Sequence, residues 1–389
     1  MYKIRCVNNI AKVGTDRLGD NYEMVDDAIY ADAAIVRSAN LHEVEIPKTL
    51  LAIARAGAGV NNIPIDLCTE QGTVVFNTPG ANANGVKEMV LAGLLLSSRD
   101  ILGAAEWVRD NSDDPDIAKD AEKAKKQFAG TELAGKSIGV IGLGAIGAMV
   151  ANACRQIGMK VMGYDPFLSV HAAWSLDRHV RHVDNVADIY AEADYITIHV
   201  PATEETKGMI DAAAIDAMKD GVIVLNFARD VLVDENAMSA ALLTGHVRHY
   251  VTDFANTVSA TMKDAIVFPH LAASTKESED NCAIMAANQL KDFLEDGNIV
   301  NSVNFPQVDL GPLRADARLA VIHKNIPSMI GKFTTLVSEE NLNIENMTNK
   351  SRGEFAYTLI ELSGDVHDGL VAKTEAIEGV IRCRLITKA

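Results

Sequence analysis

The chain alternates short apolar runs with segments of helical periodicity, and this rhythm fills two stretches. The first stretch ends near residue 96, and the second covers about residues 135–275. Strands that alternate with helices are typical of parallel sheets, so we predict two doubly wound α/β domains, one flavodoxin-like and one Rossmann-like. Strands are expected at 4–7, 34–36, 51–54, 74–76, 138–141, 160–164, 195–199, 222–226, 249–253 and 266–268, and helices at 145–157, 212–218 and 235–243.

Two helical segments are expected to connect these domains. An apolar helical stretch at 86–107 and the charged segment 109–126 lie between them, and a helix at 281–295 leads to residues 301–306. This second segment could return the chain to the first domain. We therefore expect a discontinuous first domain, residues 1–96 with 285–305, and a second domain, residues 97–284.

The pattern changes after a break rich in proline and glycine at 306–312. Strand, helix, strand, strand, helix and strand are expected in that order, which is typical of a small ferredoxin-like module over residues 317–389. The expected elements cover 319–322, 328–340, 344–348, 355–362, 370–377 and 380–386.

Composition narrows the classes of partner. The formal net charge of −17 over 389 residues argues against nucleic-acid and membrane-surface binding, so an anionic substrate must be held by a few local cations. The five cysteines form no C-x-x-C pair, and we expect no metal site. The N-terminus runs directly into a strand pattern, and no apolar run approaches the length of a membrane span, which indicates a cytoplasmic protein.

A glycine-rich turn between an expected strand and helix carries the strongest chemical signal. Gly142 would allow the tight turn, Gly144 would let backbone amides approach a pyrophosphate, and Gly147 would let helix and strand pack closely. Asp165 ends the next strand, eighteen residues after Gly147, where its carboxylate can accept hydrogen bonds from ribose hydroxyls. The pattern predicts a dinucleotide ligand and favours NAD over NADP.

Three polar residues at strand ends predict an active site. Ligands of α/β sheets bind at the carboxyl ends of the strands, where Arg229, Asp253 and His270 follow three expected strands. The Arg229 guanidinium could hold a substrate carboxylate through two parallel hydrogen bonds. His270 could take a proton from a hydroxyl near neutral pH, and Asp253 could accept a hydrogen bond from a carboxamide.

Together these motifs resemble those of the D-isomer-specific 2-hydroxyacid dehydrogenases, and the resemblance covers nearly the whole chain. The matching strings lie at 36–38, 55–62, 77–80, 142–147, 164–166, 199–201, 226–229 and 269–275. The resemblance implies that His270 and Arg229 are catalytic and that NAD accepts hydride from a 2-hydroxy acid. It implies oxidation of 3-phosphoglycerate to 3-phosphohydroxypyruvate, a step of L-serine biosynthesis.

The resemblance also implies the ligand contacts. Cofactor contacts are expected at Gly142, Gly144, Ala145, Ile146, Gly147, Asp165, Pro166, His199, Val200, Pro201, Ala228, Asp253 and Ala272. With Arg229, substrate contacts are expected at Arg37, Ser38, Ala58, Gly59, Asn82 and Lys125.

One departure from the family concerns the general base. The family places a Glu five residues after the Asp that corresponds to Asp253, to hydrogen-bond the histidine, but this chain has Val258 there. Asp264 could replace that Glu if its loop folds back. We expect the acidic limb of the kcat/KM profile to lie at lower pH than in relatives with the Glu. Two alternatives stay open: a dehydrogenase for another D-2-hydroxy acid, and an NAD(H)-sensing regulatory protein.

The C-terminal module resembles the ACT regulatory domain. His323 and Asn325 match the turn after the first strand of that domain, and Asn343 follows His323 by twenty residues. The resemblance implies that these three residues bind L-serine as an effector between paired modules. A homo-oligomer, dimer or tetramer, is therefore expected.

Overall fold

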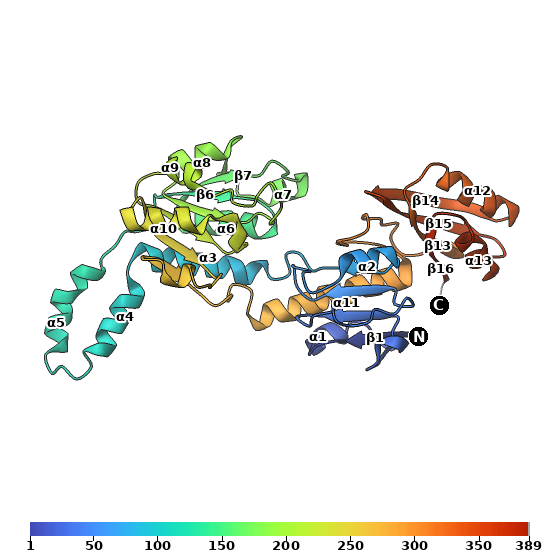
Figure 1. The fold of residues 1–389 in the computed structure, drawn as a ribbon, viewed down its shortest axis with the longest axis horizontal. Coiled ribbons are helices and arrows are strands. Elements are labelled where there is room, and N and C mark those ends of the chain that lie inside the picture. The colour runs from blue at the N-terminus through green and yellow to red at the C-terminus, as the bar shows by residue number, and fades with distance from the viewer. Residues whose placement is uncertain (388–389) are drawn as a thin grey trace. The chain divides into compact units, whose positions relative to one another are not determined.

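The computed structural model describes residues 1–387, and its contacts divide the chain into two units (Figure 1). The first unit contains Met1–Asn82 and Lys276–Ala389, and the second contains Ala83–Thr275. The chain therefore crosses between units near residues 83 and 276, whereas the sequence placed these boundaries at 97 and 285. The C-terminal module groups with the first unit.

The first unit contains a parallel sheet of five strands in the order β2-β1-β3-β4-β5, which is the expected flavodoxin-like order. β2 was not predicted, because only its first residue is buried and the segment has no apolar run. The strands are β1 (Tyr2–Cys6), β2 (Tyr22–Met24), β3 (Ala33–Val36), β4 (Ala52–Arg55) and β5 (Val74–Phe76), with α1 (Lys12–Thr15), η1 (Ala28–Tyr30), α2 (Ile65–Glu70) and α11 (Lys276–Asp296) around them.

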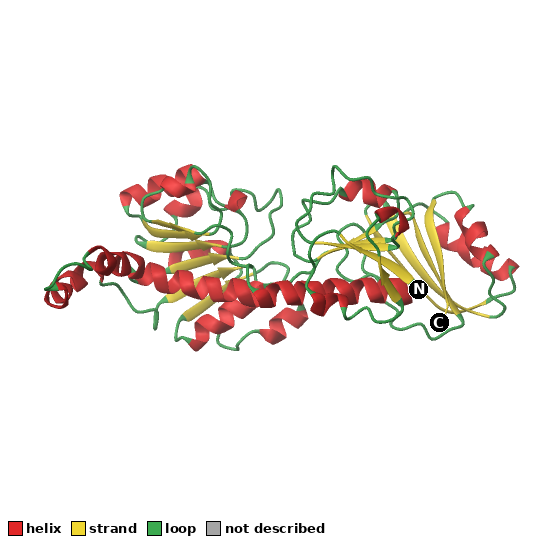
Figure 2. Ribbon diagram, turned by 90° about the horizontal axis from the view of Figure 1, so that it is seen from below, coloured by secondary structure: helices red, strands yellow, loops and turns green. Residues whose placement is uncertain are grey.

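The second unit contains a parallel sheet of seven strands in the order β12-β11-β10-β9-β6-β7-β8, which confirms the Rossmann-like prediction. Figure 2 shows these strands as a layer with helices on both sides. The strands are β6 (Ser137–Ile141), β7 (Lys160–Tyr164), β8 (Arg181–His182), β9 (Tyr195–Ile198), β10 (Val222–Asn226), β11 (Val247–Thr252) and β12 (Ala265–Val267). The helices around the sheet are α3 (Ala83–Ser98), α6 (Ala145–Gln156), α7 (Val170–Ser175), α8 (Val186–Glu192), α9 (Ala212–Asp216) and α10 (Glu235–Thr244), with η3 (Asp230–Leu232) and η4 (Ser259–Thr261).

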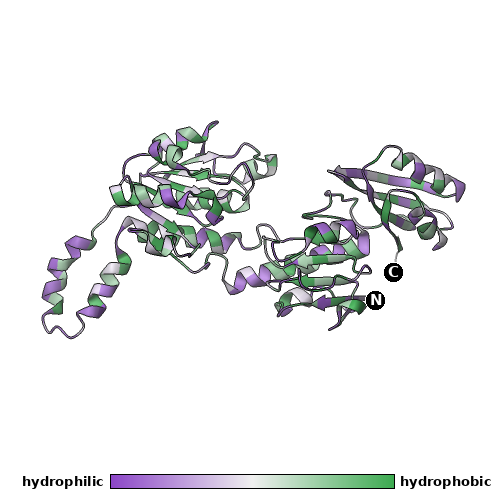
Figure 3. Ribbon diagram, viewed as in Figure 1, coloured by the Kyte–Doolittle hydropathy of each residue, from purple (hydrophilic) through white to green (hydrophobic). Residues whose placement is uncertain are grey.

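The expected helix at 86–107 is two helices. α3 ends at Ser98, and Asp100 caps a new helix, α4 (Ile101–Asp110), by accepting a hydrogen bond from the Gly103 amide at 2.9 Å. α5 (Ile117–Ala124) and η2 (Lys125–Phe128) follow. Neither α4 nor α5 contains a buried residue, although both carry hydrophobic as well as hydrophilic side chains (Figure 3).

The C-terminal module is an antiparallel sheet with two helices, as the sequence predicts. Its strand order, β14-β15-β13-β16, is that of a ferredoxin-like fold. The strands are β13 (Ala317–Lys324), β14 (Asn343–Arg352), β15 (Phe355–Ser363) and β16 (Val380–Thr387), and the helices are α12 (Met329–Glu339) and α13 (Gly369–Glu375).

The inner strands of this C-terminal sheet, β13 and β15, are buried on both faces. Leu319 and Val321 pack with Phe333 and Leu370 from the module's own helices. Residues of alternate parity on the same strand, such as Ile322, join the core of the five-stranded domain. Because successive strand residues point to opposite faces, the module uses one face for its helices and the other for the first domain.

Two arginines of β16 connect this second face to the first domain through hydrogen bonds. Arg382 donates hydrogen bonds to the carbonyl oxygens of Lys48, Leu50 (2.6 Å) and Gln71 (3.0 Å). The Arg384 guanidinium lies over the ring of Phe293, 4.1 Å from its centroid, and donates to the carbonyl of the same residue at 2.7 Å. The two cations thus satisfy backbone acceptors that lie about 90 to 330 residues away in the sequence.

Candidate active site and cofactor-binding loop

Two of the three loop glycines are required by the fold itself. Gly142 has a φ of +90°, and a Cβ atom there would lie 2.6 Å from the carbonyl oxygen of His199. A Cβ at Gly147 would lie 1.8 Å from the carbonyl oxygen of Gly142. At Gly144, in contrast, a Cβ would meet no atom within 4 Å. The protein alone therefore leaves room for a side chain at Gly144, so a glycine is useful there only if something else approaches the backbone.

The first turn of α6 is open to an anion. Gly144 is the N-cap residue and provides no side-chain cap, so the amides of the first turn, at Ala145, Ile146 and Gly147, have no side-chain acceptor. The positive end of the helix dipole lies at the same place. This arrangement suits the pyrophosphate of a dinucleotide.

Asp165 is held at the end of β7 by the loop that it faces. Its Oδ2 atom accepts a hydrogen bond from the amide of Leu143 and its Oδ1 atom from the amide of Phe167, both at 2.9 Å. Each carboxylate oxygen can accept a second hydrogen bond. The carboxylate is thus fixed beside the glycine loop, with Pro166 next in the chain, and can still accept from two ribose hydroxyls.

His199 follows β9 and begins the segment with Val200 and Pro201. Its Nε2 atom lies 3.0 Å from the hydroxyl of Thr197, whereas its Nδ1 atom is shielded from solvent and has no hydrogen-bond partner in residues 1–387. Burial lowers the pKa of His199 to about 3, so the ring is neutral at physiological pH. A ligand near this segment would meet a neutral imidazole.

Arg229 is positioned by the backbone that follows β10. The side-chain amide of Asn226 donates to the carbonyl oxygen of Arg229 at 2.8 Å and so fixes the turn after Ala228. The Arg229 guanidinium is exposed and uses Nη1 to donate to the carbonyl of Ala228 at 2.6 Å. Its remaining donors face solvent and are available for a carboxylate.

Asp253 and His270 are joined through the backbone at the ends of β11 and β12. The amide of His270 donates to the carbonyl oxygen of Asp253 at 2.9 Å, and His270 has a left-handed backbone with a φ of +52°. The Oδ2 atom of Asp253 accepts from the amide of Ala272 at 3.0 Å, while Oδ1 is buried without a partner in the described chain. Non-glycine residues with positive φ concentrate at functional sites.

Electrostatic interactions connect Asp253 with Arg229 and His270. Burial raises the pKa of Asp253, and this rise is opposed by the hydrogen bond from Ala272 and by the positive charges of His270 and Arg229. Asp253 is therefore electrostatically coupled to both catalytic candidates. Its unpartnered Oδ1 atom is suited to accept a hydrogen bond from the carboxamide of a nicotinamide.

Asp264, which could replace the family's Glu only if its loop folds back, makes no hydrogen bond or ion pair with His270 in residues 1–387. Asp264 precedes β12, whereas His270 follows it, so the strand separates them. The Asp264 carboxylate pairs with Lys263 at 3.7 Å, and Val258 is 41 % exposed at the start of η4. The ring of His270 packs edge-on against Phe254, with 5.3 Å between ring centroids, and makes no hydrogen bond to the described residues.

The loop after β3 in the first unit is organised by a residue that sequence reasoning missed. The Oδ1 atom of Asn8 accepts hydrogen bonds from the backbone amides of Arg37, Ser38 and Ala39, each at 3.0 Å. The Arg37 guanidinium pairs with Glu279 at 2.5 Å, and both side chains are about 40 % exposed. The signal for Asn8 was available, because it is a polar side chain just after the strand β1.

The loop after β4 presents free backbone donors. The amides of Ala58 and Gly59 make no hydrogen bond to any residue in the described part of the chain. The side-chain amide of Asn77 donates to the carbonyl of Ala58 at 2.7 Å and holds the loop. The Oδ1 atom of Asn82 is buried and also has no partner in residues 1–387. Two adjacent amides of this kind can bind a carboxylate.

Comparison with known proteins agrees with this geometry. The family model for the NAD-binding domain of D-isomer specific 2-hydroxyacid dehydrogenases matches residues 91–272. Residues 91–272 belong to the D-isomer specific 2-hydroxyacid dehydrogenase family. The matched residues include the glycine loop, Asp165, Arg229 and His270, so this part of the chain carries the family's NAD-binding domain.

Two curated relatives of this chain carry the name D-3-phosphoglycerate dehydrogenase. D-3-phosphoglycerate dehydrogenase of Mycobacterium tuberculosis (strain ATCC 25618 / H37Rv) is 37 % identical over 72 % of this chain and 54 % of its own length. The enzyme of that name from Escherichia coli (strain K12) is 29 % identical over 88 % of this chain and 83 % of its own length. The chain thus spans about half the length of the mycobacterial relative.

A solved structure confirms the fold of the dehydrogenase region. NAD⁺-bound 3-phosphoglycerate dehydrogenase of Entamoeba histolytica matches with a TM-score of 0.61 and 27 % identity, over 78 % of this chain and 98 % of that one.

Lys125, an expected substrate contact, is engaged in an ion pair with a neighbouring side chain. It follows α5, where its ammonium group pairs with Glu122 one helical turn earlier. No hydrogen bond or ion pair joins Lys125 to Arg229, Asp253 or His270 within residues 1–387.

One of the three expected effector residues, His323, already uses both ring nitrogens within the module. His323 is only 2 % exposed, with Nδ1 2.8 Å from the carbonyl of Lys324 and Nε2 2.9 Å from the hydroxyl of Thr358. Burial lowers the pKa of His323. Neither ring nitrogen is left for a ligand, because the strand turns this side chain into the module. Asn325 and Asn343 are exposed.

Within residues 1–387, no group of three or more His, Cys, Asp or Glu side chains is arranged to hold a metal ion, and no helix has both the length and the apolar character to cross a membrane. The five cysteines are free thiols.

Proposed function

We propose that this chain is a D-3-phosphoglycerate dehydrogenase, which oxidises 3-phosphoglycerate to 3-phosphohydroxypyruvate with NAD in L-serine biosynthesis. The observation that carries the proposal is the coupling of Arg229, Asp253 and His270 at the carboxyl edge of a dinucleotide-binding sheet. The names of the relatives from Mycobacterium tuberculosis and Escherichia coli support the choice of substrate.

The residues present fit NAD. Gly144 leaves open space over the loop, the first turn of α6 offers backbone donors, and Asp165 retains acceptor capacity for a ribose. The unpartnered Oδ1 atom of Asp253 can accept from the carboxamide, next to Ala272. When bound, NAD supplies the hydride acceptor of the reaction.

The chain's own groups bind the substrate and move its proton. The Arg229 fork and the amides of Ala58 and Gly59 would hold the carboxylate, and Arg37 would exchange Glu279 for the substrate phosphate. His270 would take the proton of the C2 hydroxyl on a ring nitrogen as the C2 hydrogen leaves with its electron pair. The balanced products are the keto acid, NADH and one proton.

Two experiments test the reaction and the substrate. NADH formation from 3-phosphoglycerate should be seen with the wild type, and His270→Ala should lower kcat by about 10²- to 10⁴-fold. D-Glycerate, which lacks only the phosphate, should react far more slowly. Arg37→Ala should raise KM for 3-phosphoglycerate and leave D-glycerate turnover unchanged, while Arg17→Ala, an exposed arginine of the same unit, should change neither.

The two alternatives predict other results. Efficient turnover of unphosphorylated D-2-hydroxy acids by the wild type would assign the chain to another dehydrogenase of the family. NADH binding without turnover of any 2-hydroxy acid would assign it to an NAD(H)-sensing regulatory protein, an alternative that Val258 favours.

We assign substrate binding to residues 1–82 with 276–305, NAD binding to residues 83–275 and a regulatory role to the ACT-like module, residues 317–389. A homo-oligomer is supported by the exposed helices α4 and α5, where Ile101, Leu102 and Val108 are exposed.

Binding of L-serine as an effector stays a prediction. To contact serine, His323 would have to break both of its hydrogen bonds. Loss of activity on serine titration would support it.

A further inference from the structure

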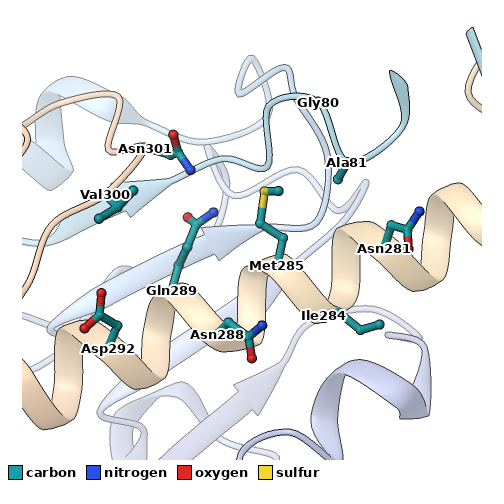
Figure 4. A pocket seen from close by; sticks show the side chains of 10 residues that line it. All are labelled: Gly80, Ala81, Asn281, Ile284, Met285, Asn288, Gln289, Asp292, Val300 and Asn301. Carbon is teal, nitrogen blue, oxygen red and sulfur yellow. The ribbon is translucent and has the colours of Figure 1, made fainter. Parts of the chain in front are cut away.

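A pocket in the first unit is lined by residues other than the expected ligand contacts, although Ala81 directly precedes Asn82 in the chain. It is formed by one face of α11, by the loop at Gly80 and Ala81, and by the segment at Val300 and Asn301 (Figure 4). Its volume is about 500 Å³, enough for a small organic molecule. None of the ten lining residues is among those expected to contact NAD, substrate or serine.

The pocket lining is rich in carboxamides and has no cation. Its polar side chains are Asn281, Asn288, Gln289, Asn301 and the carboxylate of Asp292. Its other members are Gly80, Ala81, Ile284, Met285 and Val300. Lysine, arginine and histidine are absent from the lining, so the pocket offers no counter-ion for a phosphate or a carboxylate, and Asp292 repels both.

Gln289 is the exceptional member of this set. The residue is 8 % exposed, yet neither Oε1 nor Nε2 has a hydrogen-bond partner in the described chain. In Figure 4 its side chain rises from α11 with that of Met285 toward Asn301 and the loop at Gly80. A buried polar group without a partner destabilises the fold by about 1–3 kcal/mol, and this carboxamide has two such groups side by side.

We propose that this pocket binds a small uncharged or positively charged molecule that presents a hydrogen-bond donor beside an acceptor, the simplest example being a primary carboxamide. Such an edge pairs with both atoms of the Gln289 carboxamide at once. Met285, Ile284 and Val300 supply apolar surface for an attached ring or chain. The proposal does not rest on the reaction proposed above, because the contacts that carry it belong to other residues.

Binding of nicotinamide and nicotinate to the full chain tests the proposal. These two rings differ only in carrying a carboxamide or a carboxylate, and saturating NAD keeps both out of the cofactor site. Ligand-observed NMR should detect nicotinamide and not nicotinate. Gln289→Met, which keeps the length of the side chain and removes both polar atoms, should weaken nicotinamide binding at least about tenfold.

Gln127→Met is the matched control, since Gln127 is an exposed glutamine outside the pocket, and it should bind nicotinamide like the wild type. Thermal unfolding verifies that Gln289→Met folds; its melting temperature should equal or exceed that of the wild type, because two unpartnered polar atoms are removed. Three results would overturn the proposal: no binding of nicotinamide, equal binding of nicotinate, or undiminished binding by Gln289→Met.

Discussion

The backbone amide of His270 donates a hydrogen bond to the carbonyl oxygen of Asp253 at 2.9 Å, and so fixes the candidate base to the strand end that carries the Asp253 carboxylate. Asp253→Asn keeps an acceptor for the Ala272 amide and removes the negative charge. Without that charge a protonated imidazole is less favoured, so the acidic limb of the kcat/KM profile should move to lower pH.

This shift separates an electrostatic role of Asp253 from a structural one. If Asp253 only held the loop, Asp253→Asn would lower activity equally at all pH values. A limb that moves to higher pH would contradict the coupling.

The glycine loop allows a paired test of fold and cofactor binding. Gly147→Ala places a Cβ 1.8 Å from the Gly142 carbonyl and should lower the free energy of unfolding by about 1–3 kcal/mol. Gly144→Ala meets no protein atom within 4 Å, so stability should be kept while NAD affinity falls. Chemical denaturation and calorimetric titration with NAD measure the two effects. Full NAD affinity in Gly144→Ala would show that no ligand approaches this residue.

His199 should make stability depend on pH. The folded protein keeps its ring neutral because burial lowers the pKa of His199 to about 3, whereas the unfolded chain binds the proton near pH 6.5. The unfolded state therefore binds more protons between these values, and the free energy of unfolding should fall as the pH drops from about 6.5 toward 3.

The size of the His199 effect follows from the same shift. Each pH unit in this window costs about 1.4 kcal/mol, so about 2 kcal/mol is expected between pH 6.5 and pH 5. His199→Asn should lose less stability than the wild type over this range in urea denaturation. Parallel curves for the two proteins would contradict the assignment.

Arg382 should be a main stabilising contact of the C-terminal module. Arg382→Met removes three hydrogen bonds from a cation to carbonyl oxygens, and we expect a loss of about 2–4 kcal/mol in the free energy of unfolding. Arg352→Met, which removes one exposed hydrogen bond to the Ser302 carbonyl, is the control and should cost much less. Equal losses would mean that the docking does not depend on Arg382.

The sequence predicted what depends on local pattern. The glycine loop, Asp165 and the strand-end residues Arg229, Asp253 and His270 were all found because a parallel sheet brings its carboxyl ends to one edge. β2 and β8 were missed because Tyr22–Met24 and Arg181–His182 have too few buried apolar residues to show a strand pattern. The break after α3 was missed because a capping Asp interrupts an otherwise continuous apolar run.

Features set by distant contacts could not be read from the sequence. The burial of His323 depends on Thr358, and the role of Arg382 depends on carbonyls more than 300 residues away. The same holds for Gln289, whose isolation is a property of the packed unit and not of its helix.

Because β13 and β15 are buried on both faces, the C-terminal module is not an independent part of the chain. Its removal would uncover one side of the core that contains Ile4, Phe76 and Phe293. In the separated module, Ile322, Tyr357 and Leu359 would be exposed. Cleavage within the connecting residues 306–316 should therefore leave two fragments that stay together. A conformational change in this module would therefore reach the first domain through the packing of their common core, and not through a rigid-body movement of the module on a flexible linker.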